Sequence, residues 1–450
     1  MKKLLMLILA ALLLMPLAAQ TASAAGGAGP DKDMLKGIIT QVDEANRTFT
    51  FVRESDSQEF TFIFGEKMEA RELPMGTKVM INLDQHAGPG VVKDVSRMFL
   101  DMSLKTVIAL MVIGLIGGLL SGFIGSGGAF VLTPAMMSLG VPGAVAVASN
   151  MCHKFPKAMV GAYKRYKYGQ ADLKLGLVMA ATAIIGVQIG IQIQKAILHA
   201  WGNAGSNLYV SVVFVFTLVV VGTYVFRDAQ KLAKKKDATG HEISRLAVAM
   251  QKIQLPPMMH FKTANVRISA WITVPVGLLT GMLAATIAVG GFIGVPGMIY
   301  VIGASAMVAS ATELIIAFVM GFWGSVQWGL SGLIDIRLTL LILSTSLIGV
   351  QLGALGTTYV KDYIIKIVMG SVMLIVAVSR GAKIPGYLAD LGWATELAPQ
   401  TATLLEGVSF WALVAALATA GIIISAAMAK GIISHRAEEA RTLAEARDNG

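Results

Sequence analysis

The chain has 450 residues, of which 55% are hydrophobic and only 14% charged, with a net charge of +10 and a mean hydropathy of +0.69. A soluble globular protein carries about 25% charged residues, so this composition argues against a soluble enzyme and indicates an integral membrane protein. The basic residues cluster in two short segments between apolar runs, which argues against nucleic-acid binding. The single cysteine, Cys152, excludes a disulfide framework and a CxxC metal or redox site.

Residues 1–24 have the organisation of a secretory signal peptide. A basic start, "MKK", precedes a long apolar stretch and the small-residue site "ASA" at 22–24. Cleavage is expected near Ala24 or Ala25, and an uncleaved anchor helix is the alternative. Residues 25–32 form a short linker, and cleavage places the segment that follows outside the cytoplasm.

Residues 33–98 are a different kind of sequence, built from short strand-like runs. Segments such as "RTFTFV" and "EFTFIF" alternate polar and apolar residues, which is typical of half-buried β-strands. Five such segments, separated by turn-like stretches, predict a small periplasmic β-barrel of the OB-like or SH3-like kind. This stretch shows no metal-binding or catalytic cluster. A cap or spacer is therefore the simplest interpretation, and a ligand- or partner-binding domain is the alternative.

From residue 104 onward the chain consists mainly of apolar runs typical of membrane-spanning helices. Two segments between these runs are basic: 154–174 has six Lys or Arg and one acid, and 227–267 has nine Lys or Arg and three acids. The positive-inside rule places both segments in the cytoplasm. The predicted spans are 104–124, 127–140, 143–160, 175–198, 206–226, 268–288, 290–303, 306–325, 335–357, 361–379 and 408–429, and residues 430–450 form a cytoplasmic tail.

The two halves of the apolar region match each other. "GGAFVLTP" pairs with "VGGFIGVP", so Phe130 corresponds to Phe292, and further on "IIGVQIG" pairs with "LIGVQLG" at an offset of 163 residues. The copies, 104–226 and 268–380, contain five predicted spans each, and an odd number forces the second copy to lie inverted. Inverted five-span repeats are an architecture of secondary transporters, and a purely structural bundle is the alternative.

The second span of each copy is short and follows a glycine cluster, "GFIGSGG" at 122–128 and "VGG" at 289–291. A helix that begins in the middle of the membrane exposes backbone N–H groups, which must face protein or a water-filled cavity. Two such helix starts that meet at the centre make an anion site from backbone dipoles, without a buried lysine. Tight helix packing is the competing interpretation of the glycines.

The stretch "GLIGGLLSGFIGSGGAFVLTPAMMSLGVPGAVAVAS", followed by "GQAD" and "IIGVQIG", resembles the TauE/SafE sulfite exporter family, and "GLLTGMLAATIAVGGFIGVPGMIYVIG" resembles its second repeat copy. The resemblance covers about 104–380 and implies export or uptake of small sulfur oxyanions or organosulfonates. "GSGGAF" departs from the family's three glycines before the aromatic residue, and the second copy has a four-residue insertion and Glu313. The family's motif positions fall on Gly122, Gly125, Gly127, Gly128, Pro134 and Ser149, and in the second copy on Gly281, Gly290, Gly291, Pro296 and Thr312.

Polar side chains inside the predicted spans are further candidates. Glu313 lies in "ASATELIIAFVMG", and an acid inside a membrane is costly and usually functional. Because burial favours the neutral carboxyl group, Glu313 is a candidate proton carrier, and a structural acid is the alternative. His153 is a second proton-coupling candidate, although the simpler interpretation places His153 and Lys154 near the cytoplasmic interface, with Lys154 snorkelling. The predicted substrate-binding residues are Gly125, Ser126, Gly127, Gly128, Pro134, Ser149, Asn150, Gly290, Gly291, Pro296, Thr312, Gln188 and Gln351.

Some of these polar residues have structural alternatives. Gln188 and Gln351 are equivalent amides that either contact the substrate or hold helices together. Asp172 and Asp335 are expected to cap the helices that follow them. Cys152 beside His153 lacks an oriented third group, so a nucleophile is not expected.

The sequence therefore predicts a mainly α-helical polytopic membrane protein with two inverted five-helix repeats, broken helices and an N-terminal β-barrel-like domain. The expected function is secondary transport, most simply export, of small sulfur-containing anions such as sulfite, driven by the proton gradient. No enzyme activity, cofactor, metal or nucleic-acid partner is expected. The expected location is the inner (plasma) membrane, with the N-terminal domain outside the cytoplasm. The sequence also allows a homo-oligomer. The alternative is a membrane-anchored sensor or scaffold whose β domain binds a partner.

Overall fold

The computed structural model describes residues 34–43, 45–53, 57–64, 78–83, 91–97, 100, 102–125, 128–234, 243–360 and 362–448. The predicted signal peptide, 1–24, and the linker, 25–32, lie outside the described residues. The chain divides into two compact units, Met1–Met102 and Ser103–Gly450.

The first unit contains a five-stranded barrel. Its strand order, β1-β2-β3-β5-β4, closes on itself, with β3 and β5 parallel and the other neighbours antiparallel. All five predicted strands are confirmed. They are β1 (Met34–Asp43), β2 (Thr48–Arg53), β3 (Glu59–Phe64), β4 (Lys78–Leu83) and β5 (Val91–Arg97).

The alternating pattern of β2 accounts for the core of this barrel. Phe49 and Phe51 are buried, and their rings lie 5.9 and 5.8 Å from the ring of Phe62 in β3. The turn between β1 and β2 is closed by Asn46, whose backbone and side-chain N–H groups donate to the Asp43 carboxylate. These hydrogen bonds stabilise the charged carboxylate and so lower the pKa of Asp43.

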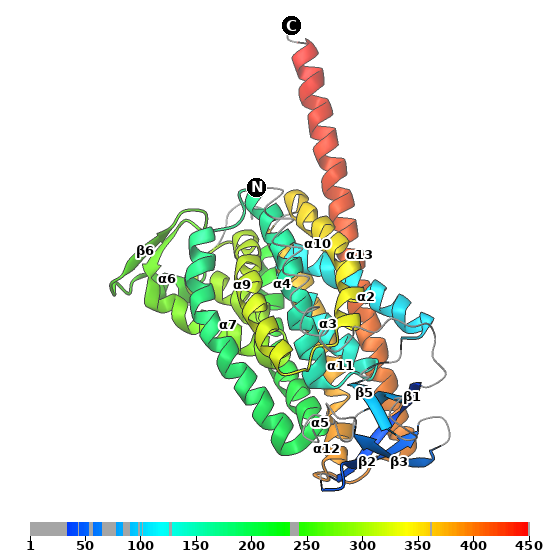
Figure 1. The fold of residues 1–450 in the computed structure, drawn as a ribbon. Coiled ribbons are helices and arrows are strands. Elements are labelled where there is room, and N and C mark those ends of the chain that lie inside the picture. Colours follow the sequence, from blue (N-terminus) through cyan, green and yellow to red (C-terminus); the bar gives the residue numbers. More distant parts are fainter. Residues whose placement is uncertain are drawn as a thin grey trace. The chain divides into compact units, whose positions relative to one another are not determined.

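The second unit is a helical bundle (Figure 1). Seven of its described helices are long and apolar enough to cross a membrane, and α4, which carries several lysines, is not one of them. The elements are α2 (Leu104–Ile124), α3 (Ala129–Ser138), α4 (Gly143–Lys167), α5 (Leu173–Lys234), α6 (Arg245–Gln251), β6 (Met258–Phe261), β7 (Val266–Ser269), α7 (Ala270–Ile287), α8 (Gly291–Gly297), the π-helix η3 (Met298–Ile302), α9 (Ala306–Leu330), α10 (Ile336–Gly356), the 3-10 helix η4 (Thr357–Tyr359), α11 (Asp362–Gly381), α12 (Ile384–Asp390) and α13 (Pro399–Asp448).

Every predicted span coincides with a helix of this unit. The predicted break between the fourth and fifth spans falls at Gly202, where φ of 62° and ψ of −157° interrupt α5. The predicted basic loop, 227–267, is more ordered than expected, because it contains the end of α5, the helix α6 and the β6–β7 hairpin. The predicted last span and tail form one continuous helix, α13, drawn in orange to red in Figure 1.

Two helix pairs approach closely through glycines at equivalent positions of the sequence copies. α2 packs on α10, and a Cβ on Gly122 would collide with the carbonyl of Val350. α7 packs on α5 in the same manner, with Gly281 against the carbonyl of Ala183. Small residues let helices meet at backbone distance within a membrane. The packing interpretation of the glycines is therefore confirmed for Gly122 and Gly281.

Two buried aspartates begin the long helices that follow α4 and α9. Asp172 Oδ1 accepts a hydrogen bond from the Leu175 N–H at 3.0 Å, and Asp335 Oδ1 accepts one from the Leu338 N–H at 3.2 Å. Both predicted caps are confirmed. The second oxygen of Asp172 also accepts from the backbone of residues 263–264, which ties the β6–β7 hairpin to the start of α5.

Candidate functional site

The predicted interruption in the first sequence copy is present. α2 ends at Ile124, and Gly125 follows with φ of +105°, a conformation that favours glycine. α3 then begins after Gly128, which is its N-cap residue. Ser126 and Gly127, which are predicted site residues, lie outside the described residues.

The second copy is interrupted at the equivalent place. α7 ends before Ala288, which is left-handed with φ of 62°, and α8 begins at Gly291 with Gly290 as its N-cap. The two short helices meet at their starts, because the rings of Phe130 in α3 and Phe292 in α8 have centroids 4.2 Å apart. The predicted equivalence of these phenylalanines thus corresponds to a direct contact.

Pro134 and Pro296 lie inside α3 and α8, not at the helix starts, and both are buried. A proline inside a helix removes one backbone hydrogen bond to the preceding turn. Directly after Pro296 the winding changes to the π-helix η3. The prolines therefore interrupt the backbone hydrogen bonding of the short helices after the first turn and do not form the helix starts.

Ser149 and Thr312, the predicted substrate hydroxyls, make equivalent bonds between the copies. Thr312 Oγ1 accepts a hydrogen bond from the Asp172 N–H, and Ser149 Oγ accepts one from the Asp335 N–H, each at 2.9 Å. All four residues are buried. Each hydroxyl therefore holds the start of a long helix of the other copy, and a contact with substrate stays a prediction.

Asn150 and Glu313 also occupy equivalent positions and are buried. Asn150 Nδ2 donates to Thr133 Oγ1 in α3 at 2.8 Å. The Glu313 carboxylate lies against Gly294 in α8, where a Cβ would collide with Oε2. Each side chain thus contacts the short helix of its own copy, and these are the two helices whose starts meet.

α4 carries basic side chains that are buried in the bundle, not exposed near the predicted cytoplasmic interface. Lys154 is fully buried, and its Nζ donates to the Ala288 carbonyl at 3.0 Å, between α7 and α8. The interpretation that Lys154 snorkels to the surface is therefore wrong, because the side chain extends into the bundle. His153 is also buried, with Nε2 2.7 Å from Ser346 Oγ in α10.

Lys157, one turn further along α4, is fully buried, and its Nζ has no hydrogen-bond partner among the described residues. Lys157 is not among the residues predicted from the sequence, and the predicted anion site, built from helix starts without a lysine, did not anticipate two buried lysines on α4. A comparison of the two sequence copies could have identified these lysines. At the offset of 163 residues, Lys154 and Lys157 correspond to Ala317 and Met320, so both lysines depart from the repeat.

Charge interactions connect these side chains. Lys154 on α4 is near enough to Glu313 on α9 for their opposite charges to attract, and it repels Lys157 on its own helix. Arg165, near the end of α4, has a different role, because its guanidinium donates to the Gly122 carbonyl at 2.9 Å and holds the end of α2. The structure therefore places Lys154 near Glu313 of the second copy, and Lys157 lies beside Lys154 on α4.

The predicted glutamines are not part of this buried group. Gln188 is half-buried on α5. Gln351 is exposed on α10, and its side-chain amide donates to the Leu347 carbonyl of the same helix at 3.1 Å. The structure thus does not bring Gln351 to the interrupted helices.

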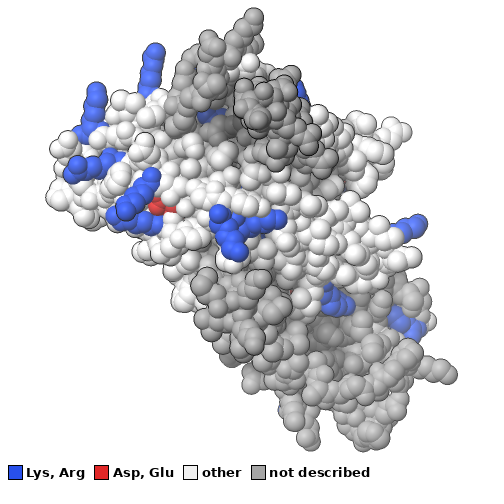
Figure 2. Space-filling model, turned by 90° about the horizontal axis from the view of Figure 1, so that it is seen from above, with Lys and Arg blue, Asp and Glu red and all other residues white. Residues whose placement is uncertain are grey.

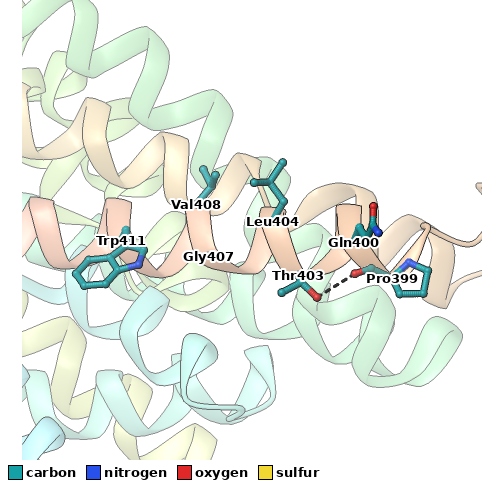
Figure 3. Close-up of a pocket in the computed structure, with 7 residues that line it drawn as sticks. All are labelled: Pro399, Gln400, Thr403, Leu404, Gly407, Val408 and Trp411. Carbon is teal, nitrogen blue, oxygen red and sulfur yellow. Dashed lines mark hydrogen bonds between the residues drawn. The ribbon is translucent and has the colours of Figure 1, made fainter.

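A groove of about 800 Å³ runs along α13 (Figure 3). Leu404 and Trp411, which line it, are 66% and 68% exposed. Trp411 belongs to the predicted span 408–429, where a lipid-facing aromatic side chain is expected. None of the predicted site residues is among the described residues that line the groove. Among the described residues no cluster of His, Cys, Asp and Glu is suited to a metal ion. The described lining residues are Pro399, Gln400, Thr403, Leu404, Gly407, Val408 and Trp411.

An apolar helical bundle with interrupted helices and buried ionisable side chains defines a polytopic membrane protein of the transporter class. Residues 110–380 match the sulfite exporter TauE/SafE family. The chain belongs to this family. The match covers α3 to α10 and most of α2 and α11, and it leaves out the barrel and α13.

Two relatives from Bacillus subtilis strain 168 carry related descriptions. The probable membrane transporter protein YunE is 25% identical over 277 residues, which is 60% of this chain and 95% of the relative. The probable membrane transporter protein YdhB is 22% identical over 256 residues, which is 55% of this chain and 89% of the relative. No solved structure matches the chain.

Proposed function

We propose that the protein is a proton-coupled secondary transporter of small sulfur-containing anions, such as sulfite or organosulfonates. The family supports the substrate class. The observation that carries the proposal is the pair of ionisable groups beside α8. Lys154 bonds to the Ala288 carbonyl just before this helix, and Glu313 lies against Gly294 within it.

The proposed architecture is a pair of inverted five-helix repeats. Reciprocal contacts support it: α2 packs on α10 while α7 packs on α5, and the bonds of Ser149 and Thr312 are equivalent. Transporters with such repeats bind substrate where interrupted helices meet, and alternating access moves one part of the bundle around that site. We assign the anion to the region beside Phe130 and Phe292.

The proposed coupling residue is Glu313. An ionised carboxylate beside the anion would repel it, whereas a protonated Glu313 would not. Proton binding and anion binding would then favour each other, so that the proton and the anion would cross the membrane in the same direction. The burial of Glu313 supports this role, because a buried carboxyl group exchanges its proton only when the site opens.

The proposed orientation places the basic end of the bundle in the cytoplasm of a cell with an inner (plasma) membrane. The last turn of α4 carries Lys164, Arg165 and Lys167, and the β6–β7 region carries Lys262 and Arg267. Figure 2 shows Lys and Arg side chains over the face seen from above, with little acidic surface among the coloured atoms. This distribution supports the positive-inside assignment, which leaves the N-terminal barrel outside.

The test is anion flux in proteoliposomes containing the full chain. Vesicles are loaded with sulfite, sulfate, thiosulfate, taurine or sulfoacetate, with and without an imposed pH gradient. We expect saturable sulfite flux that follows the gradient and a weaker response to sulfate. Absence of flux for every anion, from folded protein in both orientations, contradicts the proposal.

A membrane-anchored sensor or scaffold is the second candidate, favoured by the barrel being a compact unit of its own. Deleting residues 33–98 separates the two functions. A transporter is expected to retain most of its flux without the barrel, because the family match begins at residue 110. A sensor would lose its response, and its bundle would show no flux before or after the deletion.

A further inference from the structure

We propose that the Lys157 ammonium group holds the negative charge of the anion at the centre of the bundle. This inference rests on the proposed transport function and names the side chain that binds its substrate. It depends on four properties of Lys157: its burial, its lack of a described partner, its surroundings and its departure from the repeat.

A buried ammonium group without a partner is costly, so a structure retains it only where something compensates the charge. Two other buried lysines of the bundle have a partner for the ammonium group. Lys366 is 3% exposed and pairs with Asp228 at 2.7 Å, and Lys154 bonds to the Ala288 carbonyl. Lys157 is fully buried and has no such partner among the described residues, which leaves its donors for a ligand.

The surroundings of Lys157 suit a transported anion. α4 packs on α9, α10 and α7 of the second copy as well as on α3 of its own. Lys157 is one turn from Lys154 and His153, and its charge interacts with both. A site enclosed by both copies is where alternating access requires the substrate to be held.

The repeat relationship relates Lys157 to the short helix of its own copy. Met320, the repeat mate of Lys157, lies beside Gly290, the N-cap of α8, because a Cβ on Gly290 would be 2.9 Å from the Met320 methyl group. In the first copy the atoms nearest a Cβ on Gly128 belong to Gly117 and Ser121, so Lys157 does not take the place of Met320 against this N-cap. α4 nevertheless packs on α3, and the repeat relation therefore indicates only that Lys157 belongs to the helix that covers α3.

The charges in this group also fit a coupled mechanism. With Lys154 and Lys157 protonated and Glu313 ionised, one positive charge remains uncompensated. Protonation of Glu313 raises this to two, which matches a dianion such as sulfite.

The test compares Lys157→Met, Lys157→Arg and the control Lys164→Met in detergent-solubilised full-length protein. Methionine is the residue that the repeat places at this position, so the variant is expected to fold. Lys164 is a good control because it is on the same helix and its Nζ donates to the Gln351 carbonyl, outside the buried group. Thermal unfolding and calorimetric titration are measured with sulfite, sulfate, thiosulfate, taurine and sulfoacetate.

We expect sulfite to stabilise the wild type and Lys164→Met, and its Kd to rise at least about tenfold in Lys157→Met, which corresponds to about 1.4 kcal/mol. Lys157→Arg should keep most of the affinity. Without anion, Lys157→Met should unfold at the same or a higher temperature than the wild type, because an unpaired buried charge has been removed. A purely structural lysine gives the opposite result, a lower unfolding temperature.

Three outcomes overturn the inference: unchanged affinity in Lys157→Met, a lower unfolding temperature of that variant without anion, or no binding of any anion to the wild type. Flux in the same preparations distinguishes this from failure of the transport proposal. If the wild type transports anions and Lys157→Met binds them with unchanged affinity, the role of Lys157 is rejected and the transport function stands. If anion binding depends on Lys157 but no flux is observed, the transport function is rejected and the binding site at Lys157 stands.

Discussion

Phe130 and Phe292 contact each other where the two short helices begin, with ring centroids 4.2 Å apart and planes inclined at 57°. Both side chains are fully buried, and they occupy equivalent positions in the two sequence copies. A contact between equivalent residues marks the place where the copies meet. The aromatic pair therefore fixes the separation of α3 and α8 next to the proposed anion site.

Replacing Phe292 with alanine is expected to destabilise the bundle by about 3–5 kcal/mol, because the truncation leaves a cavity beside Phe130. Phe216→Ala is the control, since Phe216 is 70% exposed and its loss should change little. Thermal unfolding can be followed by reaction of the single, buried Cys152 with a thiol-reactive fluorophore. Equal unfolding temperatures for the two variants would contradict a structural role for the pair.

The positions of the helices could be predicted from the sequence because long apolar runs and glycine clusters are local signals. The side-chain arrangement at the centre could not, because it depends on contacts between helices far apart in the chain. Lys154 illustrates this: a lysine near a basic segment suggests a surface position, and only the fold reveals the Ala288 carbonyl beside it. Gln351 gives the opposite case, an equivalent-looking amide that the helix rotation leaves exposed.

Gly294→Ala and Gly281→Ala are expected to have different effects although both add one methyl group. At Gly294 the new Cβ meets the end of the Glu313 side chain, which can turn aside, so the fold should survive and the pH response of transport should weaken. At Gly281 it meets the Ala183 carbonyl, which cannot move alone, and a loss of about 1–3 kcal/mol is expected. Unfolding temperature and flux are measured for both variants. Similar losses of stability in Gly294→Ala and Gly281→Ala would contradict the contact between Gly294 and the movable end of the Glu313 side chain.

Ser149→Ala is expected to destabilise the protein by about 1–3 kcal/mol, because the Asp335 N–H would be left buried without its acceptor. Thr312→Val should have the same effect through the Asp172 N–H. Ser344→Ala, at an exposed hydroxyl on α10, serves as the control. If the hydroxyls also bind substrate, the variants will show a raised KM at temperatures where they remain folded, and an unchanged KM would restrict them to the structural role.

Glu313→Gln is expected to abolish the pH dependence of transport while the fold is kept, because glutamine resembles the protonated acid in shape and charge. Wild-type flux should fall as pH rises, since the ionised carboxylate repels the anion and releases it. The variant should still exchange labelled for unlabelled anion across the membrane but should not concentrate it when a pH gradient is imposed. A sulfonate substrate is the control, because its own charge does not change over the tested range, unlike that of sulfite. Equal flux of Glu313→Gln and the wild type at every pH, with and without the gradient, would remove Glu313 from the coupling mechanism.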